Sequence, residues 1–268
     1  PFRGVAITGY DPLAKAYNMV WIDSDTTRPT RSTGAWDASS QTLTMRGMQA
    51  GPEGLQPVRT VTSLSGGKRK EISYSKGPDG KEFVVMEIEF ERVASSSSAG
   101  DAELVEAAAV RTPVSSARDK MHDHLDAFLG EWTTELRQSS DKGEEPAIGS
   151  AQFRGVAGSN WIHQAYRTRI QGQAFEGHGF MGYDTSKKQY VSFWIDSMGP
   201  HLTHSAGRFE SEGKTFWLKG RMTAPTGATI DTLEAFELKG DDRIQLEIRS
   251  TRGGKPAGVM RVDYQRKR

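Results

Sequence analysis

The chain has no cysteine among its 268 residues, which excludes disulfide bonds, thiolate metal sites and cysteine nucleophiles. It also lacks an excess of charge, because 35 lysines and arginines face 34 acidic residues. The basic patch expected of a nucleic-acid-binding protein is therefore missing. No apolar run reaches the length of about 18 residues that a transmembrane helix needs. None of these absences indicates where in the cell the protein is located.

Catalytic motifs are also scarce. The segment nearest to a phosphate-binding loop, SGGK at residues 65–68, lacks the upstream glycine of that motif and is typical of a hairpin turn. The paired carboxylates Asp241 and Asp242 lie in a polar, turn-like segment. Such surroundings do not raise a carboxyl pKa toward the range used in acid–base catalysis. We therefore expect that the protein is not an enzyme.

What the sequence does contain is a long internal repeat. Residues 2–47 align without a gap on residues 175–220, with about a third of the positions identical, and both copies carry the motifs Gly-Tyr-Asp and Trp-Ile-Asp-Ser. A repeat of this length indicates two domains of the same fold. We expect an incomplete first domain at residues 1–93, a linker at residues 94–118 and a complete second domain at residues 119–268.

Alternation of apolar and polar residues predicts an all-β fold. Residues 85–91 (VMEIEFE) place every second side chain on an apolar face, as a half-buried strand does. Glycine-rich turns separate such segments at regular spacing, which favours an antiparallel barrel or sandwich. We expect about seven strands in the first copy and about ten in the second. The one exception is residues 121–132, where Met121, Leu125, Phe128 and Leu129 form an apolar helical stripe that predicts a short α-helix.

The first copy has no counterpart of residues 121–173. A barrel without its first helix and about three strands would expose two strand edges and its apolar interior, which favours aggregation in water. We therefore expect another segment to fill the gap. It would come either from chain upstream of this sequence or from strands that another subunit donates.

Several motifs together resemble one bacterial family. They are the segment FLGEW at residues 128–132, the Gly-Tyr-Asp turn, the Trp-Ile-Asp-Ser strand and the closing strand VMRVDYQR at residues 259–266. In combination they are similar to domain-of-unknown-function family fifteen-seventy-nine. This resemblance implies calycin-like antiparallel barrels, related to lipocalins, in tandem. It implies no established activity.

The calycin resemblance further implies a closing contact in each barrel. In such barrels the tryptophan of a Gly-x-Trp motif on the first strand packs against a basic side chain from the last strand. Gly130, Trp132 and Arg266 fit this pattern in the second copy. Arg92 is the matching basic residue of the first copy, where no tryptophan precedes the first visible strand.

A tryptophan and an aspartate two residues apart are the leading candidates for ligand binding. Tyr190, Trp194 and Asp196 share one face of a strand, and Trp21 and Asp23 repeat the pair in the first copy. One interpretation places the pair at the mouth of a ligand site, where a few polar groups lie among hydrophobic walls. The other makes the tryptophan a core residue and the aspartate an acceptor for N–H groups of the following turn.

The histidines all lie in the second copy. His201 and His204 are three residues apart, so on a strand they point to opposite faces, and they could share a metal only if the segment turned. His163 and His178 are single histidines on predicted strands, and either one could serve as the haem ligand that some small calycin barrels use. The residue matching His178 in the first copy is Val5. We expect no metal site and no resident cofactor.

Two hypotheses about function remain. In the first, the protein is a non-enzymatic accessory or scaffold protein that binds a protein partner as an extrinsic or assembly subunit. In the second, it carries a small apolar ligand, haem included, inside a barrel. The size of the interior side chains separates the two: large residues such as Phe216 and Tyr264 favour a filled barrel, and open interior space favours a carrier.

Overall fold

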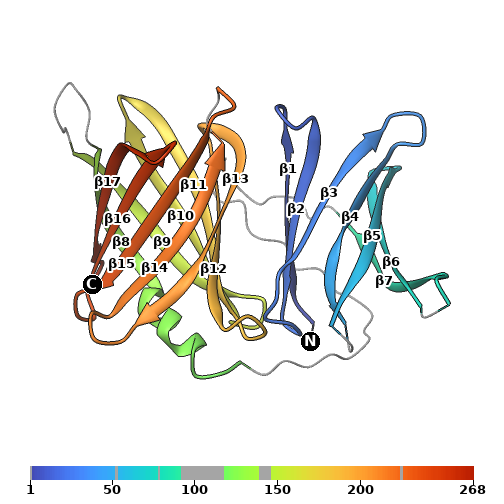
Figure 1. Ribbon diagram of the computed structural model, residues 1–268, viewed down its shortest axis with the longest axis horizontal. Coiled ribbons are helices and arrows are strands. Elements are labelled where there is room, and N and C mark those ends of the chain that lie inside the picture. The colour runs from blue at the N-terminus through green and yellow to red at the C-terminus, as the bar shows by residue number, and fades with distance from the viewer. Residues whose placement is uncertain (1, 52–53, 78, 92–117, 139–145, 224–225) are drawn as a thin grey trace. The chain divides into compact units, whose positions relative to one another are not determined.

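The computed structural model describes residues 2–51, 54–77, 79–91, 118–138, 146–223 and 226–268 (Figure 1). The chain divides into two compact units, with the boundary just before Arg118. We call the described residues up to 91 unit 1 and those from 118 onward unit 2. The expected linker, apart from Arg118, and Arg92 lie outside the described residues.

Unit 1 is a curled antiparallel sheet of seven strands in the order β1 to β7, so β1 and β7 form its edges within the described residues. Each strand pairs with the next along the chain. The strand bounds are β1 (Gly4–Asp11), β2 (Ala16–Asp23), β3 (Thr30–Asp37), β4 (Thr42–Gly51), β5 (Gly54–Ser65), β6 (Lys68–Lys76) and β7 (Glu82–Phe90).

Unit 2 is a closed antiparallel barrel of ten strands. The last strand pairs back with the first through the rows Arg266–Trp132 and Tyr264–Thr134. The strand bounds are β8 (Gly130–Gln138), β9 (Ala147–Val156), β10 (Trp161–Ile170), β11 (Gln173–Asp184), β12 (Gln189–Asp196), β13 (Gly199–Glu210), β14 (Thr215–Thr223), β15 (Thr229–Leu238), β16 (Arg243–Arg252) and β17 (Lys255–Arg266). The all-β prediction, with one complete barrel and one incomplete sheet, is confirmed.

The helix in front of the barrel differs in type from the prediction. The segment η1 (His122–Phe128) is a 3₁₀-helix and not an α-helix. Its buried residues are His122, Leu125 and Phe128, and a spacing of three is the period of a 3₁₀-helix. Gly130, with φ of +123°, turns the chain directly into β8. No helix in the described part of the chain is long and apolar enough to cross a bilayer.

The core of unit 2 fills the barrel at the end that η1 covers. Phe128 of η1 lies within 5.7 Å, centroid to centroid, of three other phenylalanine rings. The largest side chains of this core are fully buried, namely Trp132, Tyr190, Phe128 and Phe216. Side chains that face inward at the other end, among them Trp194, Ile248 and Met260, are only partly buried. We call this other end the far end of the barrel.

Candidate ligand-binding site

Trp132 and Arg266 meet at the covered end of the barrel. The guanidinium carbon of Arg266 lies 4.2 Å from the centre of the indole ring, a cation–π contact. Arg266 also donates hydrogen bonds to the carbonyl oxygens of Ala127, Leu129 and Asp241. A Cβ atom on Gly130 would lie 2.7 Å from the Arg266 Nη1 atom. The arrangement therefore ties the end of η1 to the last strand and requires glycine at position 130.

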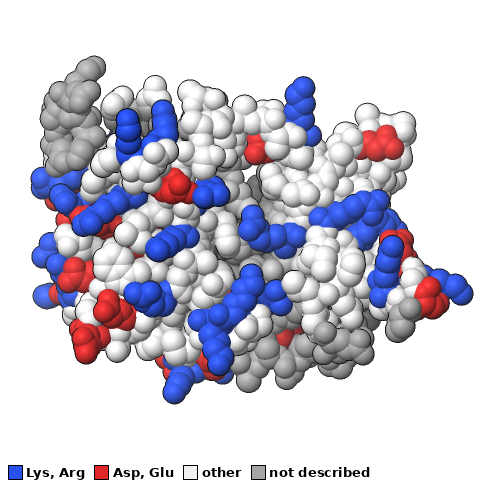
Figure 2. All heavy atoms as spheres, viewed as in Figure 1, with Lys and Arg blue, Asp and Glu red and all other residues white. Residues whose placement is uncertain are grey.

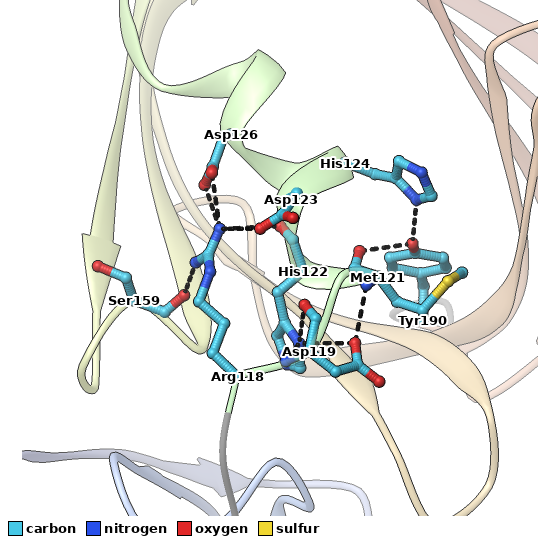
Figure 3. A network of polar contacts seen from close by, with 9 residues as sticks. All are labelled: Arg118, Asp119, Met121, His122, Asp123, His124, Asp126, Ser159 and Tyr190. Atoms are coloured by element: carbon cyan, nitrogen blue, oxygen red, sulfur yellow. Dashed lines mark hydrogen bonds and ion pairs between the residues drawn. The ribbon is translucent and has the colours of Figure 1, made fainter.

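Tyr190 belongs to the anchoring of η1 and not to the far end (Figure 3). Its hydroxyl donates a hydrogen bond to the carbonyl oxygen of Met121 at 2.7 Å and lies 2.7 Å from His124 Nδ1. On the other side of the helix, Arg118 pairs with Asp126 and Asp123 and donates to the carbonyl oxygen of Ser159. These contacts hold η1 across the barrel end.

The predicted Trp–Asp pairs lie at the opposite end. Asp196 is six residues beyond Tyr190 on β12, which is about 20 Å along a strand. The indole N–H of Trp194 donates to Asp196 Oδ2 at 2.9 Å, and Asp196 Oδ1 accepts the N–H of Met198. A Cβ atom on Gly177 of β11 would lie 2.2 Å from Trp194 Cζ2, so the indole lies flat against this glycine.

Unit 1 repeats this arrangement. Trp21 donates to Asp23 Oδ2 at 2.8 Å, and Asp23 Oδ1 accepts the N–H groups of Asp25 and Thr26. The clash that a side chain would cause at Gly4 is the same, with Trp21 Cζ2 at 2.4 Å. Both aspartates hold a turn and an indole, as the structural interpretation of these residues proposed, while Trp194 also remains partly exposed on the inner face.

His163 and His178 lie on the outer face of the barrel. Their neighbours Ile162, Tyr166 and Met181 belong to the interior core, and adjacent residues on a strand point to opposite faces. The two imidazoles stack, with Nε2 of His163 at 3.0 Å from Nδ1 of His178. Burial, followed by the charge of His178, lowers the pKa of His163 to about 4. The structure thus separates both histidines from Trp194 and Asp196, and His178 does not point toward a ligand inside the barrel.

Polar side chains face inward at the far end on two opposite walls. Tyr166 and Thr168 lie on β10, and Thr232 and Glu234 lie on β15, which is five strands away in a ring of ten. The hydroxyls of Tyr166 and Thr232 are buried and have no well-formed hydrogen bond within the described ranges. Tyr166 lies beside the hydroxyls of Thr134 and Thr168, and Thr232 lies beside the carboxyl group of Glu234. Sequence reasoning missed all four residues.

Glu234 is the one of these residues that carries an ionisable carboxyl group. Ser205 donates a hydrogen bond to it. Burial nevertheless raises the pKa of Glu234, and the neighbouring hydroxyls of Ser205 and Thr232 oppose this shift. The signal in the sequence is a glutamate on the apolar face of β15, in line with Thr232 and Phe236. The carboxyl group can donate a hydrogen bond to a ligand when protonated and accept one when ionised.

The outer surface of the barrel carries side chains of both charges. On the barrel, basic and acidic side chains are interspersed (Figure 2), as in the ion pairs of Glu247 with Arg249 and Arg261. Among the residues that the structure describes, no group of three or more histidine or acidic side chains is placed to hold a metal ion.

A family model matches the chain, and several solved structures are similar to it. The model of a family described as "Protein of unknown function (DUF1579)" matches residues 1–92 and 117–266. No curated protein matches the sequence. Rv2717c from M. tuberculosis is 14% identical, with a TM-score of 0.44 over 56% of this chain and 99% of that chain. The S-type phycobiliprotein lyase CPES from Guillardia theta is 12% identical, with a TM-score of 0.40 over 56% and 94%. Neither similarity bears on function.

Proposed function

The chain belongs to the DUF1579 family, and from the geometry of its complete barrel we propose that it is a non-enzymatic binding protein. In this proposal, unit 2 holds a small molecule with an apolar body and a hydrogen-bonding group at the far end of the barrel. The observation that carries the proposal is the pair of buried hydroxyls, on Tyr166 and Thr232, that lack well-formed hydrogen bonds among the described residues.

Unsatisfied buried polar groups are costly, and most of those in folded proteins have a partner. Here they lie on the inner face, next to apolar side chains that are only partly buried. Phe175, Trp194, Ile248 and Met260 provide these apolar walls. Hydrophobic walls with a few convergent polar groups are typical of small-molecule sites. A ligand that bridges the two walls would give Tyr166 and Thr232 well-formed hydrogen bonds in place of their poorly aligned contacts with Thr134, Thr168 and Glu234.

The same geometry argues against a haem inside the barrel and against a ligand at the end near η1. His163 and His178 lie on the outer face, so a haem inside the barrel would lack the axial ligand that the sequence suggested. The end near η1 is filled and offers no binding space, because Phe128 and Phe216 are fully buried there. The proposed ligand therefore lies beyond this core and carries no metal that these histidines would hold.

The experiment is a fluorescence titration of the full chain with N-phenyl-1-naphthylamine, an apolar probe with one N–H group. We expect saturable binding with one molecule per chain. Met260→Trp would fill the far end and abolish binding. Val259→Trp, at the adjacent position on the opposite face of β17, is the matched control and would leave binding unchanged. Absence of binding to the wild type, or equal binding to both variants, would rule the proposal out.

A second candidate function is the binding of a protein partner, as an accessory or assembly subunit. It is favoured by aromatic side chains on the inner face of unit 1. Tyr10 and Trp36 are 45% and 40% exposed. Their counterparts in unit 2 are Tyr183 and Phe209, whose rings lie 5.8 Å and 4.2 Å from the His122 and His124 rings of η1. A helix from a partner would cover the two exposed residues of unit 1 in the same way.

Mass spectrometry of natively purified protein tests this second function. A native mass heavier than the denatured chain, with a second polypeptide released on denaturation, is expected if a partner covers unit 1. A native mass equal to that of the denatured chain would contradict it.

A further inference from the structure

We propose that the inner face of unit 1 binds an uncharged ligand that both donates and accepts hydrogen bonds, at a cluster centred on Arg69 and Glu71. The proposal does not depend on the ligand site of unit 2. The two units share their strand pairing and the Trp–Asp pairs. Their inner faces, however, carry side chains of different polarity at matching positions.

The difference is concentrated on β6 and on the strand that matches it, β16. In unit 2, Tyr264 and Val262 of the last strand pair with Ile244 and Leu246. In unit 1, Phe90 and Ile88 of the last strand pair with Arg69 and Glu71. Two aliphatic core residues of one barrel thus correspond to an arginine and a glutamate in the other unit. The Arg69 side chain is 39% exposed, but the Glu71 carboxylate is buried. A buried carboxylate is costly even when it is paired, so its presence here requires a reason other than stability.

The cluster is a connected network. Arg69 Nη2 and Thr62 Oγ1 both donate to Oε1 of Glu71, and the Glu71 side chain is only 4% exposed. One row further along the strands, the hydroxyls of Thr60 and Ser73 lie 2.9 Å apart, and both residues are buried. The inner face of β5 and β6 is therefore lined with groups that donate and accept hydrogen bonds.

One buried polar atom of this cluster has no partner among the described residues, namely Nε of Arg69. The guanidinium carbon of Arg69 lies 4.7 Å from the centre of the Phe90 ring, which fixes the orientation of its plane. An unused N–H group in a fixed orientation beside an aromatic ring is suited to hold an acceptor atom of a flat ligand.

The charge of the cluster decides the ligand class. Arg69 is already neutralised by Glu71, so a carboxylate or phosphate ligand would place a second anion beside a buried carboxylate. A carboxamide or hydroxyl group instead accepts from Arg69 and donates to Glu71 without adding charge. Nearby, Trp21, Ile88, Met86 and Phe2 form an apolar cluster that can pack against the body of the ligand. An aromatic amide therefore represents the expected class.

Benzamide and benzoate are the matched probes for this proposal, because they differ only in charge and hydrogen-bond donors. Binding to the ¹⁵N-labelled full chain would be followed by NMR through the Nε–H signal of Arg69 and the backbone signals of β6. We expect benzamide to bind at least about tenfold more tightly than benzoate, which corresponds to about 1.4 kcal/mol.

Glu71→Gln keeps the shape of the side chain and removes its charge. It would leave Arg69 without a counter-ion and reverse the preference, so that benzoate binds more tightly than benzamide. Glu87→Gln is the matched control: it removes the same charge from the opposite face of β7, where the carboxylate pairs with Lys70, and leaves the preference of the wild type unchanged. Spectra of each variant without probe establish that it is folded.

Three results would overturn the proposal. The first is that neither probe shifts the Arg69 or β6 signals of the wild type at millimolar concentration. The second is that benzoate binds the wild type as tightly as benzamide. The third is that Glu71→Gln, folded as shown by its spectrum, leaves the preference unchanged.

Discussion

The inner faces of units 1 and 2 share one arrangement of glycine, tryptophan and aspartate, which we call the Gly–Trp–Asp frame, and differ in the side chains around it. In each unit a glycine on one strand lies against the indole of a tryptophan on the next, and an aspartate two residues later accepts the indole N–H. Around this frame, the strand pair β16 and β17 of unit 2 packs aromatic and aliphatic side chains. The matching strands of unit 1 place Glu71 and Ser73 there, beside the buried Thr60 and Thr62.

This comparison separates the residues that make the fold from those that give each unit its chemistry. The Gly–Trp–Asp frame recurs where the strands must approach closely and turn. The side chains of β5, β6, β15 and β16 change between copies without a change in strand pairing. Function is therefore sought at the positions that differ, in agreement with the general rule that sites vary on a constant fold.

The largest effect on stability is expected at Trp132, a residue with no counterpart in the described part of unit 1. Trp132→Ala removes a fully buried indole from the covered end, and we expect a loss of about 3–5 kcal/mol in the free energy of unfolding. Denaturant unfolding, followed by the NMR signals of unit 2, measures it. Trp36→Ala in unit 1, where the ring is 40% exposed, would cost about 1 kcal/mol or less. An unchanged unfolding midpoint for Trp132→Ala would refute the proposed closure of the barrel.

The next largest effect on stability is expected at the glycines that contact the indole rings in the two units. Gly4→Ala and Gly177→Ala each place a Cβ atom within 2.4 Å of an indole carbon, and overpacking of this kind costs about 1–3 kcal/mol. Thermal unfolding should show a similar loss in both variants. Gly258→Ala, where a Cβ atom meets nothing within 4 Å, is the control. A loss in one unit alone would mean that the frame is not shared.

A third pair of variants compares hydroxyls on the two inner faces. Thr62→Val in unit 1 removes the hydrogen bond to the buried Glu71 and should cost about 1–3 kcal/mol. Tyr166→Phe in unit 2 removes a hydroxyl without a well-formed partner in the described residues and should change stability by less than about 0.5 kcal/mol. Chemical denaturation of both variants tests the difference, and equal losses would contradict the account of the far end.

The smallest expected effect is the pH dependence of stability that the buried carboxyl group of Glu234 gives to unit 2. Burial also raises the pKa of Asp23 in unit 1, so the test compares Glu234→Gln with the wild type, which both keep Asp23. Burial raises the pKa of Glu234 above its ordinary value of 4.5, so the folded state holds this proton to a higher pH than the unfolded state. Stability contributed by the protonated form is therefore present at low pH and is lost as the pH rises above about 4.5. The melting temperature of Glu234→Gln should fall less over this range than that of the wild type. Parallel curves would show that Glu234 is not buried in solution.

Much of the fold could be predicted from the sequence because its signals are local. The alternation in β7 and β17 identifies strands directly, and the repeat predicts the number of strands in each copy. The type of η1 could not be predicted with the same ease. Its buried positions, His122, Leu125 and Phe128, include a histidine that the hydrophobic stripe of an α-helix leaves out.

The candidate sites were harder to predict because they depend on register. His163 and His178 are fifteen residues apart, and only the pairing of β10 with β11 brings their rings together. In β6 (KRKEISYSK), polar residues occupy both faces, so the sequence does not show that Arg69 and Glu71 point inward. Their pairing with Phe90 and Ile88 of β7 shows it.

The most direct test of the central claim is one NMR experiment on the ¹⁵N-labelled full chain with two probes in turn. We predict that N-phenyl-1-naphthylamine shifts the indole N–H signal of Trp194 and leaves that of Trp21 unchanged. We predict that benzamide shifts the Nε–H signal of Arg69 in unit 1 and leaves that of Trp194 unchanged. If both probes shift the same unit, the claim that the two inner faces have diverged in what they bind is contradicted.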